Sequence, residues 1–414
     1  MSAPTVHENI GHTLLVWEEE QLRIIVRRVR VNQRDGNVTG QITITSDAPS
    51  FADNHHLHES GFNFTSASAR RTLAKDLGER YQEFDWSRIL EQLCKELTHI
   101  VRRGEPAVEI YTNEDVEPPK YLLYPLLPLN LPTIVFGDSG VGKSEFALVV
   151  ATCVRLPWRD NTLGFEVGEE GGGVLYLDFE TDKSDIAWRL KCLQRGFNLP
   201  DFSIHHRYST LSLADDIEQI QEIISQKKVK LIIVDSLGAA CGGDLNAADV
   251  ALRFFNALRS LKTTTLIIAH TSKDPNVKQK TIFGSAFFKA AARSVWECRK
   301  AQETGEDDIS IALFHQKANI SKLHQPIGFK FSFETDKTYC RQQDVKGVAE
   351  FRDALSAAVQ IRDVLKRGAM STEEIQDETA LAKDTIRKTL NRMKDRGEVI
   401  KLGTHKWGLA SHEE

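Results

Sequence analysis

The sequence predicts an α/β protein whose central domain is a mostly parallel β-sheet with helices on both faces. Between residues 121 and 335, short apolar runs alternate with segments of helical period, a pattern typical of successive βαβ units. Residues 1–116 instead place strands before helices, which predicts a separate α+β module. Residues 351–411 combine three helical segments with a final hairpin, which predicts a winged helix-turn-helix.

The N-terminal module is predicted to contain a β-hairpin. Apolar and polar residues alternate in 22–26 and again in 38–44, on either side of the turn sequence Arg-Asp-Gly-Asn at 34–37. The later parts of this module are predicted as two helices, over 67–77 and after Asp85, and a linker at the two prolines 118 and 119.

The sequence assigns no role to two features of this module. One is a set of arginines on the first hairpin strand, which form either a ligand-binding basic face or a merely solvated one: Arg23, Arg27, Arg28 and Arg30. The other is the histidine cluster at 55–59. Adjacent histidines do not provide a defined tetrahedral spacing, so we predict an exposed loop there and not a metal site.

The strongest local signal is a glycine loop between an apolar run at 131–136 and a helix-like run at 145–150. This strand, loop and helix order is that of a nucleotide-binding P-loop, in which backbone N–H groups cradle phosphate oxygens. Lys143 is predicted to reach the β- and γ-phosphates, and Ser144 to ligate Mg²⁺. The predicted cofactors are therefore ATP and Mg²⁺. The predicted nucleotide-binding residues are Gly137, Asp138, Ser139, Gly140, Val141, Gly142, Lys143, Ser144 and Glu145.

Two carboxylates end neighbouring apolar runs of the central domain. Asp235 closes the run 231–235 and is predicted to hold Mg²⁺ through water, although an aspartate that simply ends a strand is the plain alternative. Glu180 follows the run 174–179 and is the candidate to polarise the attacking water. Asp178 competes for that role, but strand alternation places it two residues inside the sheet. Either acid also suits a helix N-cap or a surface charge.

A third strand end carries polar groups that we expect near the γ-phosphate. His270 and Thr271 follow the apolar run 265–269, where they could sense hydrolysis. The following loop, 272–283, contains three lysines: Lys273, Lys278 and Lys280. These form either a contact with a phosphodiester backbone or a solvated lysine-rich turn.

The order of these motifs, completed by Gly284-Ser285, resembles that of the RecA-like ATPases, and most of all the hexameric replicative helicases of the DnaB and plasmid RepA kind. The resemblance covers about 210 residues. It implies a homo-oligomer, possibly a hexamer, in which Glu180 activates water. Residues 316–319 are similar to the family's Lys-x-Arg finger, which reaches the γ-phosphate of a neighbouring subunit. Lys317 matches that finger, but Asn319 replaces its arginine and leaves one cation instead of two. An ordinary lysine at a strand end is the alternative.

The C-terminal module resembles the winged-helix domains of DNA-binding regulators. Its third helical segment and hairpin, residues 382–407, carry eight basic and three acidic residues, whereas the second helix has four acids and no base. This segregation suits a third helix beside duplex DNA. Contacts with protein, or a lid on its own ATPase, remain the alternatives. The DNA-binding candidates are Lys383, Arg387, Lys388, Arg392 and Lys406.

The composition limits the classes of function. With 41% hydrophobic and 27% charged residues and a net charge of -5, the chain of 414 residues is a globular protein without a uniformly basic coat. Six scattered cysteines suggest neither a disulfide framework nor a zinc site, and prolines interrupt the most apolar stretch at 121–136. The start of the chain lacks the features of a secretory signal. We therefore expect a cytoplasmic protein without a membrane partner.

These observations predict a Mg-dependent ATPase that acts on DNA as an oligomeric helicase or remodelling motor in replication or recombination. An ATP-switched DNA-binding regulator without translocation is the rival class. A RecA-like scaffold ATPase that does not act on DNA is a third.

Overall fold

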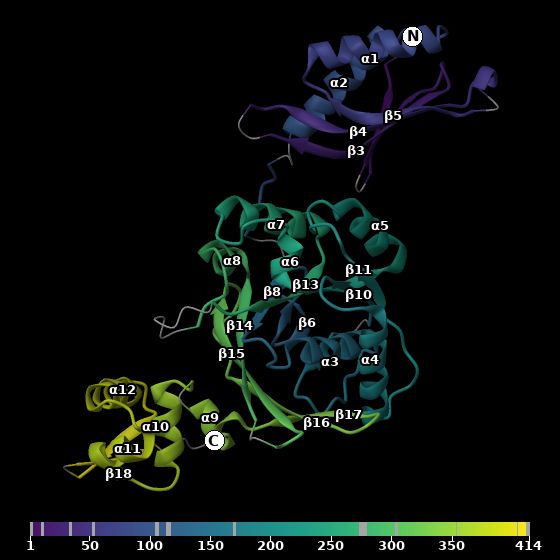
Figure 1. Cartoon of the computed structure of the whole chain (residues 1–414). Helices are drawn as coiled ribbons and strands as arrows, with labels where there is room; N and C mark the ends of the chain where they lie inside the picture. Colours follow the sequence, from purple (N-terminus) through teal and green to yellow (C-terminus); the bar gives the residue numbers. More distant parts are fainter. Residues whose placement is uncertain are drawn as a thin grey trace. The chain divides into compact units, whose positions relative to one another are not determined.

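The computed structural model describes residues 3–9, 12–32, 35–51, 54–103, 107–112, 117–168, 171–272, 280–302, 305–352, 354–403 and 405–410. The chain forms two compact units (Figure 1). One unit comprises residues 1–118 and 211–229, and the other residues 119–210 and 230–414.

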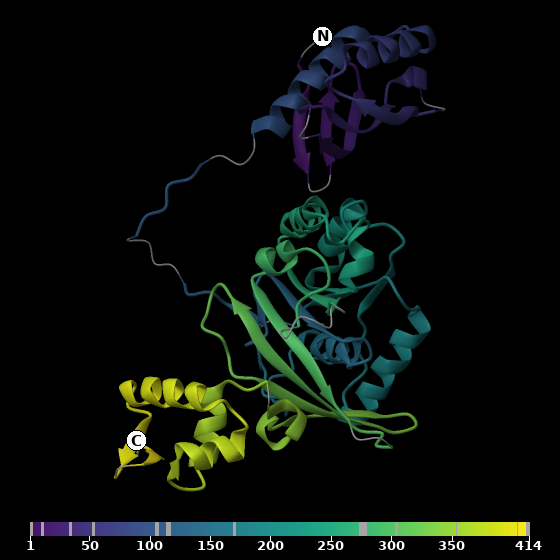
Figure 2. The ribbon, with the colours of Figure 1, turned by 60° about the vertical axis from the view of Figure 1, so that its left-hand side comes forward.

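The N-terminal module is an antiparallel sheet with two helices on one face (Figure 2). The alternating apolar residues predicted for the hairpin, among them Ile24 and Ile42, are buried in its core. Ser66 caps the first helix by accepting a hydrogen bond from the N–H of Ala69. In spatial order the strands are β1 (Thr5–Asn9), β2 (His12–Trp17), β3 (Leu22–Val31), β4 (Val38–Ser46) and β5 (His56–Asn63); the helices are η1 (Pro49–Phe51), α1 (Ala67–Arg80) and α2 (Trp86–Arg103).

The histidine cluster of this module was predicted as an exposed loop, and that prediction is wrong from His56 onward. Residues 56–63 form the edge strand β5, paired antiparallel with β4. Leu57 points into the core, whereas His56 and Glu59 are exposed on the other face. One apolar residue among four polar ones gave too weak an alternation for an edge strand to be recognised. Among the described residues, no group of three metal-ligating side chains is present.

The central sheet has nine strands and confirms the predicted α/β class. The pairs β10–β11, β12–β13, β13–β8 and β8–β14 are parallel, and β14 to β17 are joined by antiparallel pairs. Its strands, in spatial order, are β11 (His205–Tyr208), β10 (Gly173–Asp178), β12 (Val229–Asp235), β13 (Thr264–His270), β8 (Pro132–Gly137), β14 (Ser294–Ala301), β15 (Ile309–Ala318), β16 (Ile327–Phe333) and β17 (Thr338–Gln343).

The mostly parallel sheet ends in antiparallel strands. The apolar run at 309–314 belongs to β15, which is antiparallel to β14. Only residues 302–308 separate the two strands, which is shorter than the crossover of a dozen or more residues that a parallel pair needs. Periodicity identifies a strand but does not give its direction.

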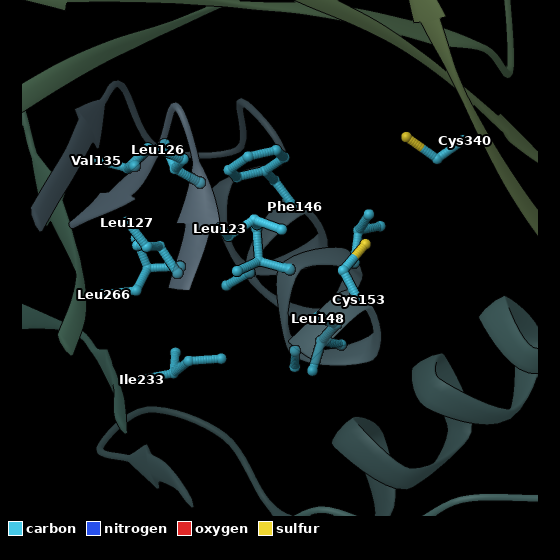
Figure 3. Packing of buried hydrophobic residues seen from close by; sticks show 14 of the residues in the cluster. Leu123, Leu126, Leu127, Val135, Phe146, Leu148, Cys153, Ile233, Leu266 and Cys340 are labelled. Atoms are coloured by element: carbon cyan, nitrogen blue, oxygen red, sulfur yellow. The ribbon is translucent and has the colours of Figure 1, made fainter. Parts of the chain in front are cut away.

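One helix forms the centre of the hydrophobic core. Nearly every residue of α3 (Lys143–Arg155) is buried, and Phe146, Leu148 and Cys153 pack among Leu123 and Ile233 (Figure 3). A helix that is apolar on all sides requires such an enclosed position. The other helices between residues 121 and 335 are α4 (Lys183–Phe197), α5 (Ile217–Lys227), α6 (Leu237–Cys241), α7 (Ala248–Leu261) and α8 (Ala286–Ala291); a small sheet joins β6 (Tyr121–Tyr124), β7 (Leu127–Pro128) and β9 (Glu166–Val167).

The C-terminal segment contains three helices around a small apolar core. Ser371 and Glu374 form the predicted capping box at the start of the middle helix. The winged-helix assignment and the domain limits 1–116, 121–335 and 351–411 stay predictions. The elements are η2 (Val345–Gly347), α9 (Ala349–Arg352), α10 (Ala357–Leu365), β18 (Met370–Ser371), α11 (Thr372–Thr379), α12 (Lys383–Asp395), β19 (Val399–Leu402) and β20 (Lys406–Leu409).

In the part of the chain that the structure describes, every helix is too short or too polar to cross a lipid bilayer.

Candidate nucleotide-binding site

The glycine loop lies between β8 and α3, as predicted. Gly140 and Gly142 have φ values of +72° and +88°, a left-handed conformation that side chains with a Cβ rarely adopt. A Cβ on Gly137 would lie 2.4 Å from the carbonyl oxygen of Cys298, so the close approach of β14 also requires glycine. The loop therefore turns sharply at the carboxyl end of β8 and presents the N-terminus of α3 to a ligand.

Lys143 is held inside this loop. Its side chain is buried, with the residue 5% exposed, and its Nζ donates to the carbonyl oxygens of Gly137 at 3.0 Å and Asp138 at 2.6 Å. Burial lowers the pKa of Lys143, and neighbouring acidic groups, Asp235 among them, oppose that shift. These donors are already directed at the space enclosed by the loop, where phosphate oxygens could replace the two carbonyls.

Ser144 and Asp235 come together beside the loop. Asp235 ends β12 and is 7% exposed. Its carboxylate accepts hydrogen bonds from the hydroxyls of Ser144 and of Tyr176, the latter at 2.6 Å. Burial raises the pKa of Asp235, an effect that these two hydrogen bonds oppose. A hydroxyl and a carboxylate next to a triphosphate are the oxygen donors that Mg²⁺ takes in such sites, so the residues present fit the predicted ion.

Asp178 holds the turn after β10. It is 1% exposed; Oδ1 accepts the N–H groups of Glu180 and Thr181 at 3.0 and 2.9 Å, and Oδ2 accepts the Thr181 hydroxyl at 2.7 Å. His206 lies 3.0 Å from Oδ2. Burial opposes ionisation, but these hydrogen bonds prevail and hold the pKa of Asp178 below its usual range. Asp178 thus fixes the conformation of the turn that carries Glu180.

Glu180 is the more accessible of the two acids. Its side chain is 47% exposed, its Oε1 accepts the Ser236 hydroxyl, and Nε2 of His270 lies 3.9 Å away. A carboxylate open to solvent at the mouth of the pocket can hold a water molecule, whereas the buried Asp178 is committed to the turn. The geometry favours Glu180 over Asp178 as the water-positioning group, which stays a prediction.

Thr271 connects the end of β13 to the P-loop. Its hydroxyl donates to Oδ1 of Asp138 at 2.5 Å, and Lys280 pairs with Oδ2 of the same carboxylate. The hydrogen bonds from Lys280 and then Thr271 lower the pKa of Asp138. Of the three loop lysines proposed to contact DNA, Lys280 is therefore tied to the nucleotide loop, and Lys273 and Lys278 lie outside the described residues.

One cavity of about 360 Å³ is lined by catalytic and metal-binding candidates, and its volume is within the range of about 300–1,000 Å³ typical of ligand sites. The candidates that line it are Lys143, Ser144, Asp178, Glu180, Asp235 and His270. Sequence reasoning missed several residues of its wall. Tyr176 could have been identified from the sequence, because it precedes Asp178 by two residues and therefore lies on the same face of that strand. The others come from α4, β15 and β16 and are not adjacent in sequence to any motif: Ile186, Arg189, Ile309 and Phe333.

The finger candidate Lys317 lies near the start of β8, whereas the P-loop of the same chain follows the carboxyl end of β8. It pairs with Val295 in the β14–β15 register, level with the start of β8. Gly137 is about 10 Å further along at 3.3 Å per residue. The Nζ of Lys317 donates to the carbonyls of Lys289, Ala290 and Ala292 at 2.6–2.9 Å, where it caps the C-terminus of α8.

A second cation lies beside the finger position. The N–H of Asn319 donates to the carbonyl of Arg293 at 3.0 Å, and the side chain of Arg293 is exposed. Arg293 also contributes to a lowered pKa of Lys317, for which burial is the largest cause. The arginine absent from position 319 therefore has an exposed counterpart at the start of the adjacent strand.

The basic residues predicted for DNA binding fall into two groups. Lys383 pairs with Glu373 at 2.6 Å, and Lys406 lies 3.9 Å from Glu374, so the acidic helix α11 holds both lysines. The remaining three lie exposed along α12: Arg387, Lys388 and Arg392.

Comparison with known proteins agrees with the fold of the central domain. Residues 106–276 match a family model described as an AAA domain. The DNA repair protein RAD51 homologue 2 of Arabidopsis thaliana is 30% identical over 129 residues, which are 28% of this chain and 33% of that protein. The chain thus spans about a third of the length of this curated relative. A KaiC-like protein of Pyrococcus horikoshii OT3 aligns over 57% of this chain and 99% of its own, at 14% identity and a TM-score of 0.36. The AAA match, the curated relative and the α/β fold support a RecA-like P-loop ATPase domain in the middle of the chain.

Proposed function

We propose that this chain is a Mg-dependent ATPase that acts on DNA as an oligomeric helicase or remodelling motor of the replicative helicase kind. The observation that supports ATP hydrolysis is the convergence of Lys143, Ser144, Asp235 and Glu180 on one cavity at the carboxyl ends of neighbouring strands. Ligands bind at that edge in open α/β sheets.

Each of these residues has a distinct part in the proposed reaction. The backbone N–H groups of the P-loop bind phosphate oxygens, and Lys143 neutralises charge that develops on the γ-phosphate. Ser144 and Asp235 would hold Mg²⁺, which supplies further charge neutralisation when bound. Glu180 orients a water molecule for attack on the γ-phosphorus, in line with the P–O bond to the leaving ADP, and accepts the proton of that water.

Two findings support DNA as the partner. Three exposed cations lie along α12, and the curated relative in the comparison is a DNA repair protein. Contact with phosphates displaces condensed counterions, so binding of this kind must weaken steeply with salt.

Replacing Arg387, Lys388 and Arg392 by alanine is expected to weaken duplex DNA binding at every sequence. The slope of log K against log salt should fall by about 0.9 for each lost phosphate contact. Fluorescence anisotropy across a salt series measures both effects. The matched control replaces three exposed cations of the N-terminal helices, Arg71, Lys75 and Arg88. An unchanged slope in the α12 variant would assign the C-terminal segment to protein contacts.

We further propose that the subunits form a head-to-tail ring or filament in which Lys317 or Arg293 of one subunit reaches the nucleotide of its neighbour. Lys317 and Arg293 lie far from the P-loop of their own chain, so either can serve only a pocket on another subunit. Lys317 would have to release the three carbonyls that it now holds.

Mixing variants tests this arrangement. Protomers with Lys143→Ala have a defective pocket but an intact Lys317, whereas protomers with Lys317→Ala have an intact pocket. In an equal mixture, about one interface in four joins an intact pocket to an intact Lys317, so the mixed assemblies should regain about a quarter of the wild-type ATPase rate. Arg293→Ala is tested in the same way, and Lys322→Ala is the exposed control. If neither edge variant is rescued and Lys317→Ala only lowers the melting temperature, the cap on α8 is the whole role of Lys317.

The rival function is an ATP-switched DNA-binding regulator, which the engagement of Lys317 by α8 favours. A strand-displacement assay with ATP distinguishes the two. Directional unwinding supports the motor, whereas ATP-dependent changes in duplex affinity without displacement support the switch. If neither single- nor double-stranded DNA changes ATP hydrolysis, both DNA functions are rejected in favour of a scaffold ATPase.

A further inference from the structure

The nucleotide cavity contains a buried acid that the proposed reaction does not use. Glu145 lies in the first turn of α3, directly after Ser144, and lines the cavity while only 9% exposed. Its Oε1 is buried without a hydrogen-bond partner. Leaving a buried acceptor unsatisfied costs about 1–3 kcal/mol, so such an atom calls for an explanation.

The walls around Glu145 show where it lies relative to a bound nucleotide. The lining includes Ile186 and Arg189 from α4, and Ile309 and Phe333 from β15 and β16. The two walls are held together where α4 contacts β17, and a Cβ on Gly196 would lie only 2.0 Å from the carbonyl of Thr338. Next to the P-loop residues, the cavity lining therefore combines apolar side chains from these elements with Arg189 and Glu145.

A nucleotide can lie in this cavity in one orientation. Its phosphates occupy the P-loop and the N-terminus of α3, so the sugar, attached to the α-phosphate, follows next along the cavity. The flat faces of a base suit the apolar side chains of Ile309 and Phe333. Glu145 directly follows Ser144, so its unpaired acceptor lines the part of the cavity next to the phosphate-binding turn.

Building on the proposed nucleotide binding, we infer that Glu145 accepts a hydrogen bond from a ribose hydroxyl and makes the pocket selective for nucleotides whose sugar carries that hydroxyl. Burial raises the pKa of Glu145 to about 7, and Arg189, which also pairs with Asp185 at 2.9 Å, only partly opposes this shift. A hydrogen bond to a buried acceptor discriminates strongly, because its loss leaves that acceptor unpaired.

Binding of ATP and 2′,3′-dideoxy-ATP to the full chain with Mg²⁺ tests the inference by equilibrium dialysis. The wild-type protein should bind ATP about 10- to 100-fold more tightly than the dideoxy analogue. Glu145→Met, which keeps the length and helix preference of the side chain, should weaken ATP to the affinity of the analogue and leave the analogue within about twofold. Glu145→Gln retains a carbonyl acceptor and should keep part of the preference. Glu222→Met on the exposed surface of α5 is the control.

The outcomes separate this inference from the nucleotide site itself. If the wild type binds both nucleotides equally, or if Glu145→Met weakens both by the same factor, the sugar contact is rejected while ATP binding stands. If the wild type binds neither nucleotide, the proposed function is rejected as well. Melting temperatures without nucleotide establish that each variant folds; removal of an unsatisfied buried carboxylate should leave them unchanged or raise them.

Discussion

Replacing Lys143 by alanine should reduce ATP affinity by about 10²- to 10⁴-fold. The lysine amino group is buried, directed at the loop interior, and the structure provides it with two backbone acceptors that phosphates would replace. Two charge-assisted hydrogen bonds of about 1.5–3 kcal/mol each account for a loss of this size. Titration calorimetry with ATP and Mg²⁺ measures it.

The control for this variant must separate lost binding from lost folding. Lys143 is 5% exposed, and its removal takes a donor from the carbonyl of Asp138 and from that of Gly137, which keeps the N–H of Thr271 at 3.3 Å. Thermal unfolding of Lys143→Ala should show an intact cooperative transition, and Lys227→Ala on the exposed surface of α5 should bind ATP as the wild type does. Unaltered ATP affinity in folded Lys143→Ala would mean that the cavity is not the nucleotide site.

The fold was predictable where local sequence decides the structure. The alternation of apolar runs and helices gave the α/β class, and the hairpin and helices of the N-terminal module followed from their periods. The direction of β15 did not follow, because an apolar run has the same period in parallel and antiparallel sheets. The edge strand β5 was missed because its two buried apolar side chains, Leu57 and Phe62, are five residues apart and do not give a period of two.

The residues of the candidate site also divide into those that local sequence predicts and those that it does not. The P-loop residues are contiguous, and Asp235 ends an obvious strand, so their meeting could be expected from the rule that ligands bind at carboxyl strand ends. Arg189 and Phe333 could not be predicted, because tertiary packing brings α4 and β16 to the cavity from distant parts of the chain. The capping of α8 by Lys317 is non-local for the same reason.

Replacing Glu180 by glutamine should leave ATP binding intact and lower the hydrolysis rate by about 10²- to 10⁴-fold. Glutamine keeps the size of the side chain and an oxygen that can accept the Ser236 hydroxyl, but it cannot take a proton from water. Single-turnover hydrolysis together with nucleotide binding separates these two effects. Glu180→Asp should also be slow, because the carboxylate withdraws by one methylene from the water it positions.

The result for Asp178 decides between the two acids. Asp178→Asn keeps an oxygen for the N–H groups of Glu180 and Thr181 but weakens the contacts with the Thr181 hydroxyl and His206. If Asp178 only positions the turn, its asparagine variant should retain a larger share of the hydrolysis rate than Glu180→Gln, and the activity of the latter should not return at higher pH. Normal turnover by Glu180→Gln together with an inactive, correctly folded Asp178→Asn would transfer the role of the base to Asp178.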